Sequence, residues 1–415
     1  MSGLRPVRGT HDLLPEGFRQ HKYVIDTACE IAERYGFDEM MPPVFEFTHV
    51  FSRTMGQTSD VVTKEMYTFP DRSGEENITL RPEFTAGICR AFASNSLYDQ
   101  VPFKVFACGP LFRYERPQKG RQRQFHQIDA EIIGVKGPQA DIEVLSVGQH
   151  ILEELEVAKS VTLRINSLGD AESREFYREK LVAYLEPFGE DLSEDSRQRL
   201  HHNPLRIFDS KSERDIEIIT DAPLLRDHLN YDSQKFFGDV CDGLSGRGIA
   251  YTIDPGLVRG LDYYTHTAFE FVTESLGAQG TVIAGGRYDG LIEQLGGRPT
   301  PGIGWAGGVE RLAMMVGNIR QRRRPVALVP IGGDACEEAN IIAQKLRKAG
   351  FMVALDYSGG MKRRLARANK ANAVIAILIG DDELKRGIVT IRDMENGEQH
   401  EKPLNNLANH LAQYR

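Results

Sequence analysis

Two long strand-like segments joined by a short basic loop constrain the fold more than any other feature of the chain. KVFACGPLFRYE (104–115) and RQFHQIDAEIIGV (123–135) are separated only by the loop RPQKGRQ. A connection this short pairs neighbouring strands antiparallel, because a parallel crossover needs a dozen or more residues. Strand signals return at 249–272 and 281–290. The larger part of the chain is therefore expected to be an α+β domain built on an antiparallel sheet.

The segments around these strands predict an edge strand, helices and an insertion. Residues 18–35 have apolar side chains at helical spacing. The extended segment that follows contains Pro42 and Pro43, which have no N–H to donate, so its strand should lie at a sheet edge or an interface. Residues from about 160 to 245 are polar and helical and are expected to form an insertion. Residues 302–319 are expected to be a glycine-rich turn that opens a helix.

A charged segment stopped by proline, RQRRRP (320–325), is the expected boundary between a domain of residues 1–320 and one of residues 325–415. Beyond it, strand and helix patterns alternate, which favours a small α/β domain with a largely parallel sheet. From Pro325 onward there are 13 Lys and Arg against 11 Asp and Glu, a net charge of +2. The first 324 residues have 38 against 48, a net charge of −10. The weakly basic second domain is compatible with RNA contact.

The composition is that of an ordinary soluble globular protein, with 41% hydrophobic and 27% charged residues. No apolar run approaches the length of a membrane span, and the first residues lack the apolar core of a secretory signal. The five cysteines are far apart and form no CxxC, which favours a reducing cytoplasm over a disulfide framework or a zinc site. No metal site is predicted, and the adjacent His201 and His202 are expected in a surface loop.

One face of the second strand carries polar groups suited to a ligand. Residues two apart share a face of a strand, which groups Phe125 with Gln127, Asp129 and Glu131. The opposite face, which starts with His126, is mostly apolar, and Arg113 shares a face of the neighbouring strand with Glu115. If the two polar faces coincide, they form the floor of a site for a ligand with several functional groups. Considered alone, this pattern slightly favours the alternative of a solvated sheet face.

The loop between the two strands is strongly basic. It contains Arg116, Lys119 and Arg121, and Arg123 follows directly. Guanidinium and ammonium groups at the rim of a polar floor suit the phosphates of a nucleotide or of an RNA backbone. A loop that is simply solvated remains the alternative.

The segment GIGWAGG (302–308) has the spacing GxGxxG, but it does not predict a dinucleotide-binding fold. No hydrophobic strand precedes it, and no acid lies about twenty residues further on. The chain also lacks the GxxxxGK[ST] of a P-loop. We expect these glycines to allow close packing of strand and helix, which places Glu310 and Arg311 at a helix start.

Three further segments carry polar groups beside glycines or prolines. RPEFT (81–85) places three polar side chains on one face if it is extended, and AGGRYDG supplies Tyr288. LVRGLDYYT (257–265) has Arg259 in an otherwise half-buried pattern, where a cation needs an anionic partner. That partner is Asp262, another acid of the core, or a ligand. The repetition of such clusters favours one composite site.

Together these segments resemble the histidyl-tRNA synthetase family, a family of class II aminoacyl-tRNA synthetases, over essentially the whole chain. YGFDEMMPPVFE is similar to motif 1 of the class, FRYE with the basic loop and RQFHQ to motif 2, and GIGWAGGVERL to motif 3. These motifs are shared by the whole class. LVRGLDYYT and AGGRYDG are the segments that resemble the histidine family in particular.

The resemblance implies a role for each site residue. Catalysis would depend on Arg113, Gln127 and Arg259. Histidine would be bound by Glu83, Thr85, Gln127, Glu131, Arg259, Tyr263, Tyr264 and Tyr288. ATP would be bound by Arg113, Glu115, Arg121, Phe125 and Arg311. The acceptor end of tRNA would contact Arg116, Gln118 and Lys119, and Pro43 would lie in the interface of a homodimer.

The resemblance also implies the reaction and its partners. L-histidine would be activated by ATP with Mg²⁺ and transferred to the terminal adenosine of tRNA(His) in the cytoplasm. The rival is the regulatory subunit of ATP phosphoribosyltransferase, a related protein that senses histidine without aminoacylating. That protein is expected to lack the C-terminal domain and to have degraded motifs, whereas this chain keeps Arg113, Arg259 and Arg311.

Overall fold

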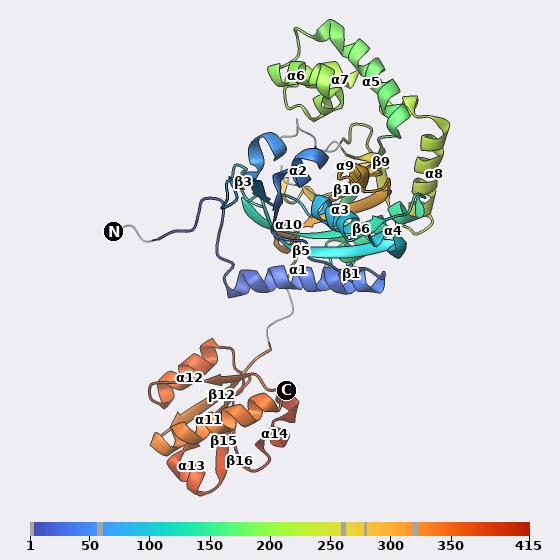
Figure 1. Ribbon diagram of the computed structural model, residues 1–415. Helices are drawn as coiled ribbons and strands as arrows, with labels where there is room; N and C mark the ends of the chain where they lie inside the picture. Colours follow the sequence, from blue (N-terminus) through green and yellow to red (C-terminus); the bar gives the residue numbers. More distant parts are fainter. Residues whose placement is uncertain (1–3, 56–60, 259–262, 278–279, 318–322) are drawn as a thin grey trace. The chain divides into compact units, whose positions relative to one another are not determined.

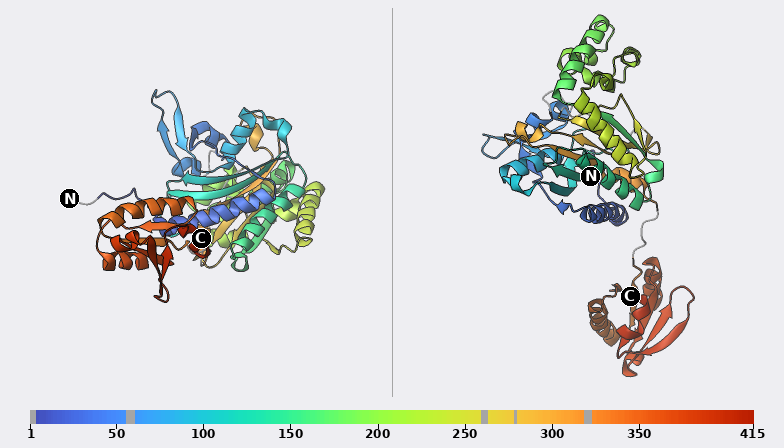
Figure 2. Two further views of the ribbon diagram at one scale, coloured as in Figure 1. Left: turned by 90° about the horizontal axis from the view of Figure 1, so that it is seen from below. Right: turned by 90° about the vertical axis from the view of Figure 1, so that its right-hand side faces the viewer.

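The computed structural model describes residues 4–55, 61–258, 263–277, 280–317 and 323–415. The chain divides into two compact units, Met1–Ile319 and Arg320–Arg415 (Figures 1 and 2). Each unit has hydrophobic clusters of its own, so each is described by itself. No helix in the described part of the chain is long and apolar enough to cross a membrane.

An eight-stranded sheet forms the centre of the first unit (Figure 1). In spatial order its strands are β1 (Asp38–Glu39), β5 (Phe103–Phe112), β6 (Gln124–Ile133), β11 (Gly302–Gly308), β10 (Thr281–Arg287), β9 (Thr265–Val272), β7 (Thr162–Ser167) and β8 (Tyr251–Ile253). The pairs β1–β5 and β7–β8 at the two edges are parallel, and the other pairs are antiparallel. The predicted α+β fold is confirmed, as are the antiparallel pairing of β5 with β6 and the edge position of β1.

Helices on one face of the sheet enclose its larger core. Apolar side chains of β6, among them Ile128 and Ile132, point toward these helices, as their parity predicts. The helices are α1 (Pro15–Arg34), α4 (Gln139–Glu154), α8 (Tyr231–Ser245) and α10 (Val309–Met315). Figure 1 shows α1 running along this face. Pro15 favours the start of α1, and Gly36, with φ of +76°, follows its end.

The opposite face of the sheet carries smaller elements and the insertion. Three short helices pack there, α2 (Thr48–Thr54), α3 (Thr85–Ser94) and α9 (Leu291–Gln294). A separate sheet of three strands is formed by β2 (Phe45–Phe47), β4 (Asn77–Leu80) and β3 (Tyr67–Pro70). The helices that project from the body are α5 (Ala171–Leu185), α6 (Glu194–His202) and α7 (Glu213–Thr220) (Figure 2). This face bears the candidate site.

Two segments differ from their predicted structure. GIGWAGG is not a turn: it is strand β11, paired on both sides with β6 and β10. The helical segment of residues 160–245 also contains sheet strand β7, and its last helix, α8, packs into the main core with α4. The helices α5–α7 alone stand apart from the sheet.

The second unit is a five-stranded sheet with helices. Its strand order is β13 (Val353–Leu355), β12 (Val326–Ile331), β14 (Ile375–Gly380), β15 (Ile388–Asp393) and β16 (Gln399–Pro403). The first three strands are parallel and the last two are antiparallel additions. The helices are α11 (Gly333–Lys348), α12 (Met361–Lys370), α13 (Asp381–Lys385) and α14 (Leu407–His410).

Candidate active site

A cavity of about 390 Å³ lies over the middle of the large sheet. Its wall is formed by strands β6, β9, β10 and β11, by the segment after β5, by the segments around the start of α3 and before β9, and by the start of α10. Most of the predicted site residues line it: Glu83, Thr85, Arg113, Glu115, Arg121, Phe125, Gln127, Tyr263, Tyr264, Tyr288 and Arg311. The polar face of β6 forms part of the cavity floor rather than a solvated surface. The first predicted strand was too long: β5 ends at Phe112, so Arg113 and Glu115 reach the cavity from the segment that follows it.

The predicted residue Glu131 does not line the cavity; its carboxyl group lies behind the wall at one end, hydrogen-bonded to two lining residues. Glu131 is fully buried on β6, and its Oε1 accepts a hydrogen bond of 2.6 Å from the Thr85 hydroxyl. Its Oε2 accepts one of 2.5 Å from the Tyr288 hydroxyl. Burial raises the pKa of Glu131 to about 7, although both hydroxyl groups favour the ionised form. This carboxyl is therefore poised between its protonated and ionised forms near neutral pH.

Two further buried acids lie at the same end. The Tyr263 hydroxyl donates to Glu83 Oε2 at 3.0 Å, and burial raises the pKa of Glu83. Asp129 is fully buried, and burial together with the neighbouring Glu131 raises its pKa well above the ordinary value. Among the described residues, two buried acceptor oxygens of this cavity have no hydrogen-bond partner: Glu83 Oε1 and Gln127 Oε1. Buried acceptors of this kind suit a ligand that brings several N–H donors.

The rest of the cavity is rich in arginine, although the carboxylates of Glu115, Glu270 and Glu310 also line it; we call this part the cationic end. Arg113, Arg121 and Arg311 line it, and burial followed by the charges of Arg121 and Arg113 lowers the pKa of Arg311. Arg311 donates to the carbonyl oxygens of Gly120, at 3.2 Å, and Thr281, at 2.6 Å. An anionic ligand would relieve the mutual repulsion of these guanidinium groups.

An aromatic ring and an ion pair complete the cationic end. The Arg113 guanidinium lies 5.4 Å from the centre of the Phe125 ring, and Arg121 forms an ion pair with the buried carboxylate of Glu115. A planar ring beside charged groups is a suitable surface for a base with phosphates attached. A nucleotide bound here would have to exchange partners with the Glu115–Arg121 pair.

Other predicted residues lie outside the cavity lining. Arg116, Gln118 and Lys119 are exposed on the loop between β5 and β6, where Gln118 and Arg121 pair across a tight turn. Pro43 is exposed between β1 and β2. Arg259 lies outside the described residues, as do Gly260 and Asp262. RPEFT is not extended, because Thr85 begins α3.

The geometry of the cavity explains why Gly302 and Gly304 of β11 have no side chain. A Cβ on Gly302 would come within 2.2 Å of the Tyr288 ring, and a Cβ on Gly304 within 1.6 Å of Glu131 Oε2. The close packing that we expected of these glycines is therefore not with a helix; it makes room for side chains of the cavity. As predicted, Glu310 and Arg311 lie in the first turn of the next helix, α10.

Several residues of the cavity were not predicted as part of a site. The alternation of β6 placed Asp129 on the polar face, two residues from both Gln127 and Glu131. That spacing was sufficient to predict that Asp129 belongs to the ligand site. The others come from separate segments whose convergence leaves no local pattern: Glu65, Arg206, Glu270 and Glu310.

A large, mainly antiparallel sheet with a polar cavity, joined to a second α/β unit, is the architecture of a class II aminoacyl-tRNA synthetase. The family model described as histidyl-tRNA synthetase matches residues 9–312, and one described as an anticodon binding domain matches residues 325–414. The chain belongs to the histidyl-tRNA synthetase family. The resemblance of the sequence motifs to that family is confirmed.

Individual relatives are similar to this chain over nearly their full length. A protein of Rhodospirillum rubrum named histidine–tRNA ligase is 55% identical over 415 residues, which is 100% of both chains. One of Gluconobacter oxydans with the same name is 53% identical over 99% of both chains. The crystal structure of apo S. aureus histidyl-tRNA synthetase is 34% identical, with a TM-score of 0.84, and covers 98% of this chain and 99% of that one.

Proposed function

We propose that the chain is a histidine–tRNA ligase, which activates L-histidine with ATP and transfers it to the terminal adenosine of tRNA(His). The observation that carries this proposal is the polarity of one cavity. Unpartnered buried acceptors lie at one end, and three arginines lie at the other. Histidine has an ammonium group, imidazole N–H groups and a carboxylate. The phosphates of ATP would bind to the arginines, next to the carboxylate of histidine.

The acidic end is suited to the donors of histidine. Glu83, Gln127 and Thr85 are placed to hold the ammonium group, while Glu131, Tyr264 and Tyr288 hold the imidazole. Tyr263 fixes Glu83 through their hydrogen bond. An amino acid without these donors would leave buried acceptors unpaired, which supports discrimination of about 10⁴-fold without an editing step.

The cationic end is suited to ATP. Arg113 would hold the α-phosphate, Arg121 and Arg311 the outer phosphates, and Glu115 and Phe125 the adenine. Mg²⁺ would supply further neutralisation of the phosphates. Glu270 also lines the cavity, and its carboxylate oxygens are ligands of the kind that Mg²⁺ prefers. It lies close to Arg311, because the Thr281 hydroxyl donates to its Oε2 at 3.1 Å and Arg311 donates to the carbonyl oxygen of the same Thr281.

The reaction then needs no protein nucleophile. The carboxylate of histidine attacks the α-phosphorus of ATP, pyrophosphate leaves, and a ribose hydroxyl of the tRNA displaces AMP from the histidyl-adenylate. Gln127 and the two arginines Arg113 and Arg259 would position the reactants and stabilise the charge that develops at phosphorus. The exposed Arg116, Gln118 and Lys119 are placed on a loop that can approach the acceptor end of the tRNA.

We also propose a cytoplasmic homodimer with Pro43 in its interface. Apolar side chains are exposed around this residue, with Met41 at 73%, Phe45 at 55% and Phe47 at 48% exposure. Such a patch is typical of a protein–protein contact. The described cysteines are all free thiols, which suits a reducing compartment.

Histidine-dependent exchange between ATP and pyrophosphate tests the proposed function. The pure protein is expected to catalyse exchange with histidine and not with other amino acids, and to charge tRNA(His). A protein that binds histidine but catalyses no exchange would instead be a histidine sensor, like the regulatory subunit of ATP phosphoribosyltransferase.

A further inference from the structure

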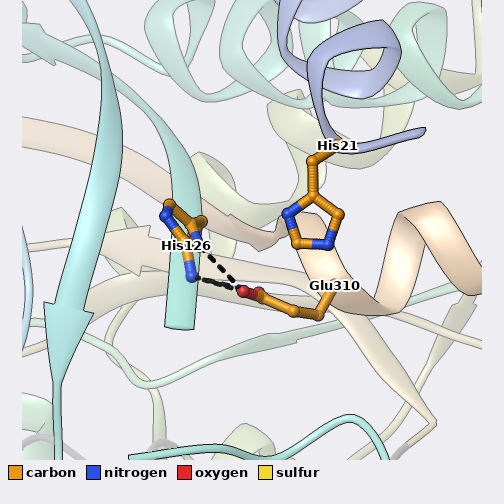
Figure 3. A group of neighbouring side chains, drawn as sticks. All are labelled: His21, His126 and Glu310. Carbon is orange, nitrogen blue, oxygen red and sulfur yellow. Dashed lines mark hydrogen bonds and ion pairs between the residues drawn. The ribbon is translucent and has the colours of Figure 1, made fainter. Parts of the chain in front are cut away.

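Two histidines and a glutamate from three distant segments meet at the edge of the candidate active site, whose cavity Glu310 also lines (Figure 3). His21 comes from α1, His126 from β6 and Glu310 from the first turn of α10. His126 lies on the face of β6 that packs against the helices, opposite the face of Gln127 and Glu131. The rings of His21 and His126 are nearly perpendicular, with their centres 5.7 Å apart.

The distances in this cluster are close to those of a metal centre. One ligand atom from each residue can be chosen so that all three lie within 4.8 Å of one another. His126 Nδ1 and Glu310 Oε1 are 2.9 Å apart. Tetrahedral ligands at about 2.0–2.2 Å from a Zn²⁺ ion are about 3.4 Å from one another, so this hydrogen-bonded pair would have to separate by about 0.5 Å to bind the ion. The upper limit of 4.8 Å means that the three side chains would have to draw closer around the ion.

The environment of the cluster also indicates a missing partner. His21 is only 8% exposed, and its Nδ1 is buried with no hydrogen-bond partner in the part of the chain that the structure describes. Glu310 is held in place, because the backbone N–H of His126 donates to both of its oxygens, at 2.9 and 3.0 Å. A carboxylate fixed by a second hydrogen bond is typical of metal ligands.

We propose that His21, His126 and Glu310 bind a divalent transition-metal ion, with Zn²⁺ as the best match. Two imidazoles and one carboxylate suit Zn²⁺ and its neighbours, whereas Mg²⁺ and Ca²⁺ prefer oxygen ligands alone. Water would complete the tetrahedral coordination. The ion would join α1 to β6 and α10, next to Phe125 and Arg311 of the proposed ATP site. This site is separate from the Mg²⁺ that accompanies ATP, and it does not depend on the proposed function.

Metal binding to the full-length chain tests this proposal without any activity assay. The protein is stripped with a chelator, dialysed and titrated with Zn²⁺ alone in a calorimeter. Co²⁺ is then added to a second sample, and its visible absorption bands report the coordination. We expect about one ion per chain and the intense bands of a four-coordinate Co²⁺ site. His21→Ala should weaken Zn²⁺ binding tenfold or more and remove these bands, and His400→Ala, which changes an exposed histidine, should change neither.

Two further variants separate a lost ligand from a lost fold. His21→Gln keeps a polar side chain of similar size and should also lose the metal. His21→Cys supplies a thiolate and should retain it. Circular dichroism must show that all variants are folded like the unsubstituted chain. Absence of Zn²⁺ binding by the unsubstituted chain, or unchanged affinity and Co²⁺ bands in folded His21→Ala, would overturn the proposal and leave the cluster as an ordinary hydrogen-bonded contact.

Discussion

At the scale of single residues, Glu131 is the group whose protonation should be visible in the stability of the protein. Its pKa of about 7 in the folded chain lies above the ordinary value of 4.5. A raised pKa means that the folded state binds the proton more tightly, so stability is fully present below pH 4.5 and is lost as pH rises through 7. A shift of this size corresponds to about 3 kcal/mol.

We therefore expect Glu131→Gln to remove this pH dependence. As pH rises from 5 to 8, the melting temperature of the unsubstituted chain, measured by calorimetry, should fall more than that of the variant. Glu293→Gln, which changes an exposed carboxyl, is the matched control and should follow the unsubstituted chain. Parallel curves for Glu131→Gln and the unsubstituted chain would mean that this carboxyl titrates with its ordinary pKa.

Arg259 is predicted from the sequence to act on the reacting groups. We expect Arg259→Ala to lower the rate of histidine-dependent pyrophosphate exchange by about 10²-fold or more, because a cation opposite a developing anion contributes several kcal/mol. The melting temperature should change little. Unfolding of the variant, or near-normal exchange, would show that this arginine has a structural role.

A third residue, Arg287, contributes to the fold rather than to the chemistry. It is fully buried, forms an ion pair with the equally buried Asp141, and donates to the carbonyl of Val135 at 2.9 Å. Arg287→Ala would leave the Asp141 charge without its partner, so we expect the loss of about 3–5 kcal/mol of stability. Urea denaturation followed by tryptophan fluorescence measures this, because Trp305 is in the same unit. The exposed Arg298→Ala should change stability by less than about 0.5 kcal/mol.

At the scale of the element, strand β11 lacks side chains where its neighbours need the space. Gly304→Ala would place a methyl group on the position of the Glu131 carboxylate, and the backbone carbonyl of Ala130 is also only 2.6 Å away. We expect the KM for histidine in pyrophosphate exchange to rise at least tenfold, because the added methyl group would displace Glu131 from the position in which we propose that it binds the imidazole. Gly238→Ala has open space around the new methyl group and should leave this KM unchanged.

The same strand shows where sequence patterns succeed and where they fail. Polar and apolar residues alternate along β6, and only a short loop separates it from β5, so the antiparallel pairing of the two strands and the face that carries Gln127 could be predicted. GIGWAGG has too few side chains to alternate, and β7 has only Leu163 and Ile165 as buried apolar residues within a polar segment. Contacts such as that of Tyr288 with Glu131, 157 residues apart, left no local pattern and were expected only through the family resemblance. The His21 cluster had neither kind of signal.

At the scale of the whole molecule, the two units differ in chemistry as well as in fold. The first contains the cavity with its acids and arginines. The second has a core of its own around Ile342, Ile377 and Leu411, and its helix α12 is strongly basic. Because each unit has a hydrophobic core of its own, we expect the first unit to stay folded when the second is removed. The division of labour between adenylate formation and tRNA binding can therefore be tested directly.

Removal of all residues after Gln321 should weaken the charging of tRNA(His) far more than the formation of histidyl-adenylate. The cavity remains in the shortened chain, so pyrophosphate exchange should stay within about tenfold of the full-length rate. The shortened chain loses the unit that matches the anticodon binding domain, with its basic helix α12, so kcat/KM for tRNA should fall by 10²-fold or more. Both rates are measured on the same preparations, after circular dichroism and gel filtration confirm folding and oligomeric state. Charging by the full chain should also fall with added salt more steeply than exchange does. An equal loss of both activities in a folded, shortened chain would mean that the second unit supports the catalytic cavity itself.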